Sequence, residues 1–189
     1  MKIIVGLGNP GKHYEQTRHN VGWLFLNWLI LDLRLKIEDF KLEKVFDAMI
    51  LDVDYQDRLL LVKPQTFMND SGKAVNAIGE FYKLDFQKEL LVIHDDTDLP
   101  LGKIKLTKSS SSAGHNGVAD IIHHLGTQNF HRIRVGVETR PTKTDLPTEA
   151  FVLQNFTADE IEKLQKEIFP KIKSEMEAFI KNWKLEIGN

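Results

Sequence analysis

Short apolar runs that alternate with helix-like segments constrain the fold of this chain more than any other feature. Six runs have the length and composition of strands, and they lie at Lys2–Leu7, Phe46–Val53, Arg58–Val62, Leu90–His94, Lys103–Thr107 and His131–Val137. In the last run, a period of two places Arg132 and Arg134 on one face and the apolar residues on the other. The runs therefore predict the strands of a sheet.

Apolar residues recur at helical spacing between and after these runs. The segments with this spacing are residues 21–33, 74–82, 118–125 and 161–183. The first is apolar on nearly all sides, which predicts a buried helix. Thr157 and Glu160 form a capping-box pattern before the last segment, and Pro170 should kink or split that helix. Strands that alternate with helices predict an α/β fold with a mixed sheet.

The bulk properties fit one globular domain that spans residues 1–189. This length allows a sizeable core, and no repeat or low-complexity linker divides it. The chain has no cysteine, which excludes disulfide bonds and a thiolate nucleophile. The N-terminus has no signal-peptide pattern, and no apolar stretch is long enough to span a bilayer. We therefore expect a cytoplasmic protein without a membrane partner.

The charge is distributed unevenly along the chain. The net charge of −2 argues against general affinity for nucleic acids. Residues 101–143, however, contain seven Lys or Arg and two Asp or Glu, whereas residues 32–57 contain eight acidic and four basic residues. This asymmetry suits a protein that meets a polyanion on one side. The alternative is a chance cluster of charges on a solvated surface.

One histidine and several amides have the chemistry of a hydrolytic site. His19 titrates near neutrality and can accept a proton from water, best when a carboxylate holds its other ring nitrogen. Asp95 follows the run Leu90–His94, and the carboxyl ends of strands are where α/β sheets present functional groups. The uncharged amides of Asn9, Asn69 and Asn116 can position water, hold a carbonyl or stabilise an oxyanion. The sequence does not distinguish which of them meets the oxyanion.

Four blocks of sequence, taken in order, resemble bacterial peptidyl-tRNA hydrolases. They are Gly-Leu-Gly-Asn-Pro-Gly-Lys-His-Tyr-Glu-Gln-Thr-Arg-His-Asn-Val-Gly at 6–22, Thr-Phe-Met-Asn-Asp-Ser-Gly-Lys-Ala-Val at 66–75, His-Asp-Asp-Thr-Asp-Leu-Pro at 94–100 and Ala-Gly-His-Asn-Gly at 113–117. The resemblance runs from Met1 to about Leu153. It implies one α/β domain with a twisted mixed central sheet flanked by helices. It also implies hydrolysis of the ester between a peptide and the 3′ end of tRNA, which recycles tRNA for translation.

The resemblance also assigns residues to the site. His19 is then the catalytic base, Asp95 the carboxylate that orients it, and Asn9 a third catalytic residue. The substrate-binding residues that it implies are Tyr14, Met68, Asn69, His115 and Asn116. A water activated by His19 suffices for an ester, so no cofactor and no covalent nucleophile are implied. The loop Ser109–Ala113 departs from the family, which usually has glycines there, and this departure bears on the mobility of the loop.

The basic region supplies candidate contacts to tRNA. We expect Lys105, Lys108 and Arg134 to bind phosphates, with Lys103 and Arg132 as second choices. Each could instead be an ordinary solvated side chain. Asn116 also has a structural alternative, because it precedes the helix expected at 118–125 and could be its N-cap.

Other functions fit the sequence less well. Gly6, Gly8 and Gly11 match a dinucleotide-binding fingerprint, but Pro10 precedes the third glycine and no helix pattern follows. We expect no metal, because the acidic residues after His94 lie at a strand end where alternate side chains diverge. The sequence contains no Gly-x-Ser-x-Gly motif, so we do not expect a serine hydrolase. A non-catalytic RNA-binding relative of the same fold remains the alternative, and we expect a monomer.

Overall fold

Strand β1 (Lys2–Gly6) occupies the middle of the sheet and is parallel to both of its neighbours, β4 (Asp57–Pro64) and β5 (Leu90–Pro100). The computed structural model describes residues 1–36, 39–144 and 146–187. Within them seven strands form one sheet in the order β2-β3-β4-β1-β5-β7-β6. The four central strands are parallel and the outer pairings are antiparallel. The α/β class and the mixed sheet are therefore confirmed.

The remaining strands agree with the apolar runs, with one addition. They are β2 (Lys41–Glu43), β3 (Ala48–Tyr55), β6 (Ile104–Lys108) and β7 (His131–Glu138). β2 was not predicted, because its side chains are exposed and carry no apolar alternation. β5 continues to Pro100, beyond the predicted end at His94, because Asp95 and Asp96 remain paired with β7. Polar residues inside a strand are invisible to an apolar pattern.

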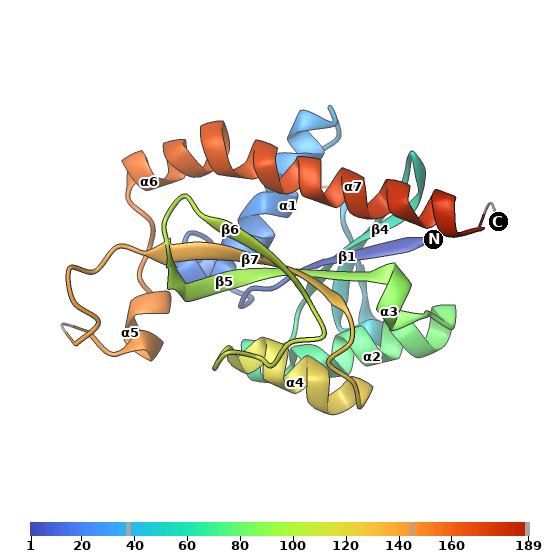
Figure 1. Ribbon diagram of the computed structural model, residues 1–189, viewed down its shortest axis with the longest axis horizontal. Helices are drawn as coiled ribbons and strands as arrows, with labels where there is room; N and C mark the ends of the chain where they lie inside the picture. The colour runs from blue at the N-terminus through green and yellow to red at the C-terminus, as the bar shows by residue number, and fades with distance from the viewer. Residues whose placement is uncertain (37–38, 145, 188–189) are drawn as a thin grey trace.

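Helices cover both faces of the sheet (Figure 1). One layer contains α1 (Val21–Asp32) and α7 (Phe169–Ile187), and the other contains α2 (Ser71–Tyr82) and α4 (Asn116–Leu125). The shorter helices are α3 (Phe86–Glu89), α5 (Thr148–Val152), α6 (Ala158–Lys163) and the 3₁₀ turns Lys12–Tyr14, Arg18–Asn20, Lys44–Phe46 and Met68–Asp70. Each layer buries its own apolar core against the sheet.

Alternation along the strands decides which core a residue joins. On β1, Ile4 packs beneath α1, whereas Ile3 and Val5 face the α2–α4 layer. On β7, Ile133 joins the core beneath α1 and α7, so Arg132 points to the opposite side, as predicted. Because both faces are covered, the central strands are apolar on both sides.

The contact between α1 and the sheet is unusually close. A Cβ atom on Gly22 would lie 2.5 Å from the Ile93 carbonyl oxygen and 2.5 Å from the Leu7 amide nitrogen. Gly6 on β1 lies opposite Gly22, and a Cβ atom added to Gly6 would lie 2.5 Å from the Gly22 carbonyl oxygen. Two glycines thus let the start of α1 rest directly on the end of β1 and on the backbone of β5 at Ile93.

The C-terminal segment folds back over the sheet and is hydrogen-bonded to the 3₁₀ turn Arg18–Asn20. Thr157 and Glu160 form the predicted capping box of α6. Glu160 also accepts hydrogen bonds from the buried guanidinium of Arg18 at 2.8 and 3.0 Å. A π-helical segment, Leu164–Ile168, precedes Pro170, so the helix changes its winding where the proline lacks an amide hydrogen. α6, the π-helical segment and α7 follow one another without a gap, so Pro170 does not split the helix, and a kink there stays a prediction.

No helix in the described part of the chain combines the length and the apolar character of a bilayer-spanning segment.

Replacing Gly22 by alanine tests the close contact. The added methyl group would meet backbone atoms that cannot rotate away, so we expect a loss of at least about 1–3 kcal/mol in the free energy of unfolding. Urea denaturation measures the change. Ser174→Ala, at an exposed position of α7, is the control and should change stability little. Equal stability of the two variants would contradict the packing described here.

Candidate active site

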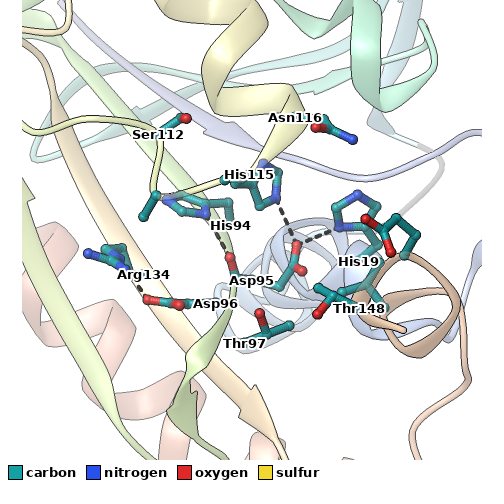
Figure 2. Close-up of a pocket in the computed structure, with 14 residues that line it drawn as sticks. His19, His94, Asp95, Asp96, Thr97, Ser112, His115, Asn116, Arg134 and Thr148 are labelled. Atoms are coloured by element: carbon teal, nitrogen blue, oxygen red, sulfur yellow. Dashed lines mark hydrogen bonds and ion pairs between the residues drawn. The ribbon is translucent and has the colours of Figure 1, made fainter. Parts of the chain in front are cut away.

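Three side chains from different elements meet at one carboxylate oxygen. Asp95 lies on β5, His19 on the 3₁₀ turn before α1, and His115 at the N-terminus of α4. The Asp95 Oδ1 atom is 2.8 Å from His19 Nδ1 and 2.9 Å from His115 Nε2 (Figure 2). The close packing at Gly22 explains how His19, three residues earlier in the chain, reaches Asp95 in the middle of β5. The predicted pairing of His19 with Asp95 is seen in this geometry.

The hydrogen bonds fix which ring nitrogens carry protons. Because a carboxylate only accepts, His19 donates from Nδ1 and keeps a lone pair on Nε2. His115 donates from Nε2 to Asp95, and its Nδ1 accepts the backbone N–H of Val118 at 3.2 Å. His94 donates from Nδ1 to the Asp95 carbonyl oxygen at 2.8 Å. Among the three, His19 offers its free nitrogen to the cavity described below.

Burial and charge oppose each other in this cluster. Burial disfavours the imidazolium of His19, but the charge and hydrogen bond of Asp95 outweigh it, so the pKa of His19 is raised above its ordinary value. Burial likewise disfavours the Asp95 carboxylate, yet His19 and His115 hold its pKa far below its usual range. Burial, reinforced by His115, lowers the pKa of His94. Asp95 is therefore ionised and His94 neutral at pH 7.

A cavity of about 280 Å³ opens beside the cluster. It is lined by His19, His94, Asp95, Asp96, Thr97, Ser112, Ala113, Gly114, His115, Asn116, Arg134, Thr148, Glu149 and Val152. At one side Arg134 Nε donates to Asp96 Oδ2 at 2.6 Å. A second, open groove lies across Asn116 and is lined by Asn69, Ala119, Asp120 and His123 as well. Asn116 borders both spaces, and each is exposed enough to admit a ligand.

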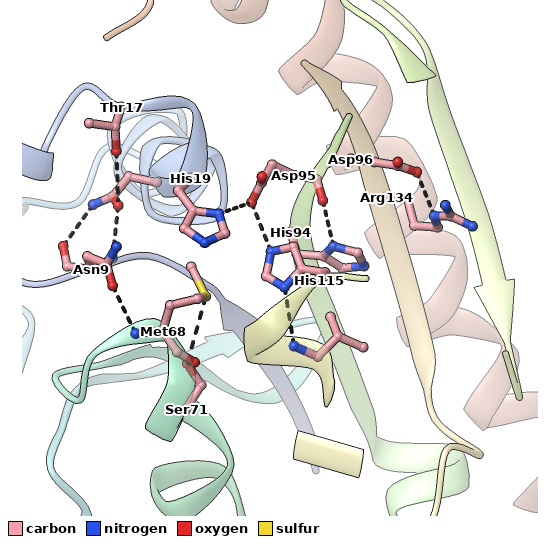
Figure 3. Close-up of polar contacts among 12 residues, drawn as sticks. Asn9, Thr17, His19, Met68, Ser71, His94, Asp95, Asp96, His115 and Arg134 are labelled. Atoms are coloured by element: carbon pink, nitrogen blue, oxygen red, sulfur yellow. Dashed lines mark hydrogen bonds and ion pairs between the residues drawn. The ribbon is translucent and has the colours of Figure 1, made fainter. Parts of the chain in front are cut away.

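A network of amides holds the first motif in place (Figure 3). Asn20 is fully buried, and its Oδ1 accepts the Asn9 backbone N–H at 2.9 Å while its Nδ2 donates to the Asn9 carbonyl at 3.0 Å. Asn9 Oδ1 accepts the Met68 backbone N–H at 2.8 Å. Asn20 was missed by sequence reasoning, although its position directly after His19 was a signal.

The other predicted substrate contacts are placed differently from one another. Asn69 and Asn116 are exposed, and neither side chain makes a hydrogen bond within the described residues. Met68 is only 4 % exposed and packs against Gly117. Tyr14 is half-buried in the 3₁₀ turn Lys12–Tyr14 and does not line the cavity. The roles of these residues stay predictions.

The N-cap of α4 is His115 rather than Asn116, because the His115 side chain accepts the Val118 N–H. Asn116 is the first residue of the helix, and its structural alternative as the cap is therefore wrong. The physical reason is that the chain is still extended at His115, where an N-cap belongs, and already helical at Asn116.

The basic residues of the predicted tRNA surface lie on two faces of the sheet. Lys105 is paired in register with Arg134, whereas Lys108 is paired with His131 at the far end of β6. By strand alternation, Lys105 shares the face of Arg134 and Lys108 points to the other face. Both lysines are exposed. Their roles stay predictions, but the cavity and Lys105 lie on the same side.

Arg132, a second-choice contact to phosphate, is buried and hydrogen-bonded to the backbone of neighbouring loops. It is 1 % exposed, and its guanidinium donates to the carbonyl oxygens of Ser111 at 2.8 Å and Gln128 at 3.0 Å. The hydrogen bond to Ser111 thus attaches the serine-rich loop, residues 109–113, to β7. Ser109 and Ala113 both have positive φ angles, so this loop adopts the conformation that glycine favours without having glycine at these positions.

The same cluster has the residue types of a metal site. One ligand atom each from His19, Asp95 and His115 lie within 4.8 Å of one another. In the observed arrangement, however, the ring nitrogens that face Asp95 carry protons. A cation bound there would have to displace the proton on His115 Nε2, which requires loss of the bond from Val118 to Nδ1. The geometry suits hydrogen bonding better than coordination.

Known proteins resemble this chain over nearly its whole length. The family model described as peptidyl-tRNA hydrolase matches residues 3–187. A curated peptidyl-tRNA hydrolase of Lactiplantibacillus plantarum is 46% identical over 165 residues, which cover 86% of this chain and 84% of the relative. One of Bacillus cereus is 42% identical over 161 residues, or 85% and 83% of the two chains. The family match extends past Leu153, where the sequence motifs end.

A solved structure has the same architecture. The crystal structure of peptidyl-tRNA hydrolase from Acinetobacter baumannii superimposes with a TM-score of 0.76 at 29% sequence identity. The match covers 95% of this chain and 94% of that chain.

Removal of the Asn20 side chain tests the amide network. Asn20→Ala would leave the buried Asn9 N–H and carbonyl without partners, and we expect it to lower the free energy of unfolding by about 1–3 kcal/mol. Asn69→Ala is the matched control, because that amide is exposed, and it should change stability by less than about 0.5 kcal/mol. Similar melting temperatures for both variants would mean that the network does not hold the motif.

Proposed function

The chain belongs to the peptidyl-tRNA hydrolase family and hydrolyses the ester between a peptide and tRNA, and we propose that His19 activates the attacking water. The observation that carries this proposal is the hydrogen bond from His19 Nδ1 to the buried Asp95, which leaves the lone pair of Nε2 directed away from the carboxylate. His19 lines the cavity, so this lone pair is accessible to water.

The proposed reaction needs no covalent intermediate with the protein. His19 Nε2 takes a proton from water as the water oxygen bonds to the ester carbonyl carbon. Asp95 stabilises the imidazolium that forms and keeps the ring oriented. When the tetrahedral intermediate collapses, the bond to the 3′ oxygen of tRNA breaks. That oxygen then receives the proton from His19, which restores the base and releases a peptide carboxylic acid.

Asn9 is suited to stabilise the oxyanion. Its Oδ1 already accepts the Met68 N–H, so its Nδ2 must point the other way. That amide nitrogen has no partner within the described residues and is not among the buried unsatisfied atoms. A fixed, accessible N–H donor near the base is what a developing oxyanion requires. Of the three candidate asparagines, Asn9 alone has its amide orientation set by the protein.

Asn69 and Asn116 are suited to grip the substrate on either side of the ester. Their amides are exposed and can donate and accept at once. Asn116 lies between the cavity and the open groove, so a substrate that passes His19 would extend from one space into the other. Tyr14 and Met68 would act by shaping this region rather than by polar contact.

We place the tRNA on the face of the sheet that carries Lys105 and Arg134. Arg134 is held by Asp96, which fixes its direction but uses part of its charge. Lys105 has no ion pair within the described residues and is the stronger candidate for phosphate. Nothing among the described residues favours a non-catalytic RNA-binding relative.

We further propose that the protein recycles tRNA as a cytoplasmic monomer. The long apolar stripe of the C-terminal helices, which could otherwise pair with a second copy, is buried in the chain's own core. Sedimentation equilibrium would test the monomer, and a stable dimer would contradict it.

Removal of the base should abolish most activity. We expect His19→Ala to fold normally and to lose about 10²–10⁴-fold in kcat on an N-acetyl-aminoacyl-tRNA. In the wild-type protein, kcat/KM should rise with pH through the raised pKa of His19, because the base works only when unprotonated. Steady-state kinetics across pH measure both. A His19→Ala variant with near-wild-type turnover would remove His19 from this role.

Substitution of two lysines on β6 distinguishes a specific contact to tRNA from a general effect of positive charge. Lys105→Gln should weaken binding of tRNA substrates and reduce the slope of log K against log salt by about one. Lys108→Gln removes the same charge from the opposite face and should have little effect. Both variants should hydrolyse a minimal ester that carries only the 3′ nucleotide at the wild-type rate. Equal effects of the two substitutions on tRNA would contradict this placement of the RNA.

A further inference from the structure

His115 has no polar atom left for a substrate. Its Nε2 donates to Asp95 Oδ1, and its Nδ1 accepts the Val118 backbone N–H. The side chain is only 7 % exposed. The His94 ring packs edge-on against it, with ring centroids 4.6 Å apart. With both ring nitrogens engaged, His115 is placed to act on its neighbours. The neighbour to which it donates a hydrogen bond is Asp95, the carboxylate of the proposed catalytic pair.

Resting on the proposed role of His19, we propose that His115 is a positioning residue that competes for Asp95 Oδ1 and so limits the protonation of His19 between turnovers. Both histidines donate to the same oxygen atom, at 2.8 Å from His19 and 2.9 Å from His115 (Figure 2). An oxygen that already accepts one N–H has less negative charge to offer a second. His115 therefore weakens the attraction of Asp95 for the proton of an imidazolium at His19.

The direction of this donation is built into the fold. His115 is the N-cap of α4, and the amide hydrogen of Val118 points at Nδ1. A proton on Nδ1 would face that hydrogen, so the ring keeps its proton on Nε2, toward Asp95. Helix capping thereby selects the tautomer that serves the catalytic carboxylate. An alternative cap residue such as serine would satisfy α4 but could not reach Asp95 with a donor.

The other charged groups around His19 do not provide this adjustment. Arg18 precedes it but is directed to Glu160. Glu149, from α5, lines the same cavity, and no ion pair joins it to His19 within the described residues. Asp96 is paired with Arg134. His19 contacts Asp95 through the hydrogen bond and His115 through rings 4.9 Å apart.

The second hydrogen bond from His115 serves the reaction because the pair of Asp95 and His19 has two conflicting tasks. Asp95 must stabilise the imidazolium of His19 in the transition state, yet a carboxylate that is buried and unshared would keep His19 protonated at rest. A protonated His19 cannot accept a proton from water. A second N–H on the same oxygen limits the attraction without removing the carboxylate that orients the ring.

Two substitutions at position 115 separate capping from donation. Asparagine is a favoured N-cap and can accept the Val118 N–H from a short side chain, but it is too short to reach Asp95. Glutamine extends its amide to about the position of Nε2 and can restore the donor. We expect His115→Asn to move the acid limb of kcat/KM upward by about one pH unit. His115→Gln should return the limb toward the wild-type position.

A substrate contact gives a different result. If His115 gripped the substrate, His115→Asn would lower kcat/KM by the same factor at every pH and leave the acid limb in place, which would overturn the proposal. Failure of His115→Gln to restore the limb while its melting temperature is unchanged would also count against it.

Nuclear magnetic resonance of the free protein tests the proposal without a substrate. Nitrogen chemical shifts of the wild-type rings at about pH 8 should show His115 protonated on Nε2 and His19 on Nδ1. Titration of His19 in His115→Asn should give a higher midpoint than in the wild type. A His115 ring protonated on Nδ1, or an unchanged His19 midpoint, would overturn the proposal. Because this readout involves no turnover, it stands even if His19 proves not to be the base.

Discussion

The arrangement of the site depends on the direct contact of the start of α1 with the end of β1 and with the inner part of β5. Gly22 lies against the carbonyl of Ile93 with no room for a side chain. Asp95 is two residues beyond Ile93, and His19 is three residues before Gly22. The contact therefore brings two segments that are far apart in the sequence within hydrogen-bond distance. Of the three glycines that match a dinucleotide-binding fingerprint, Gly6 takes part in this packing and Gly8 lies against the Trp23 ring of α1.

A buried carboxylate in the middle of β5 is central to the arrangement of the site. Asp95 is 2 % exposed, and an isolated charge at such a position would be strongly disfavoured. Two imidazole N–H groups compensate it, one from the element before α1 and one from the N-terminus of α4. The carboxylate therefore links the two halves of the chain that build the cavity. The same charge that orients His19 would hold its proton too strongly, and His115 offsets that effect.

Sequence reasoning succeeded where a local pattern carries the information. Apolar periodicity located the central strands and the main helices, and the Thr157 capping box is present. It was less successful where tertiary contacts decide. β2 has no apolar pattern, and β5 continues through acidic residues because β7 pairs with them. The N-cap of α4 is His115 and not Asn116, because the backbone becomes helical earlier in the chain than expected.

The sequence by itself indicated an α/β sheet. His19 beside amides, an acid after an apolar run and the absence of cysteine indicated a hydrolytic site without a thiolate. The distances, the proton positions and the faces were decided by the tertiary structure. Arg132 and Arg134 differ by two positions and share a strand face, yet one is closed off beneath the serine-rich loop while the other borders the cavity. No periodicity separates them, because burial depends on which loop crosses above a residue. Likewise, a sequence shows that His19, Asp95 and His115 exist, but only packing between distant segments can place two donors on one oxygen.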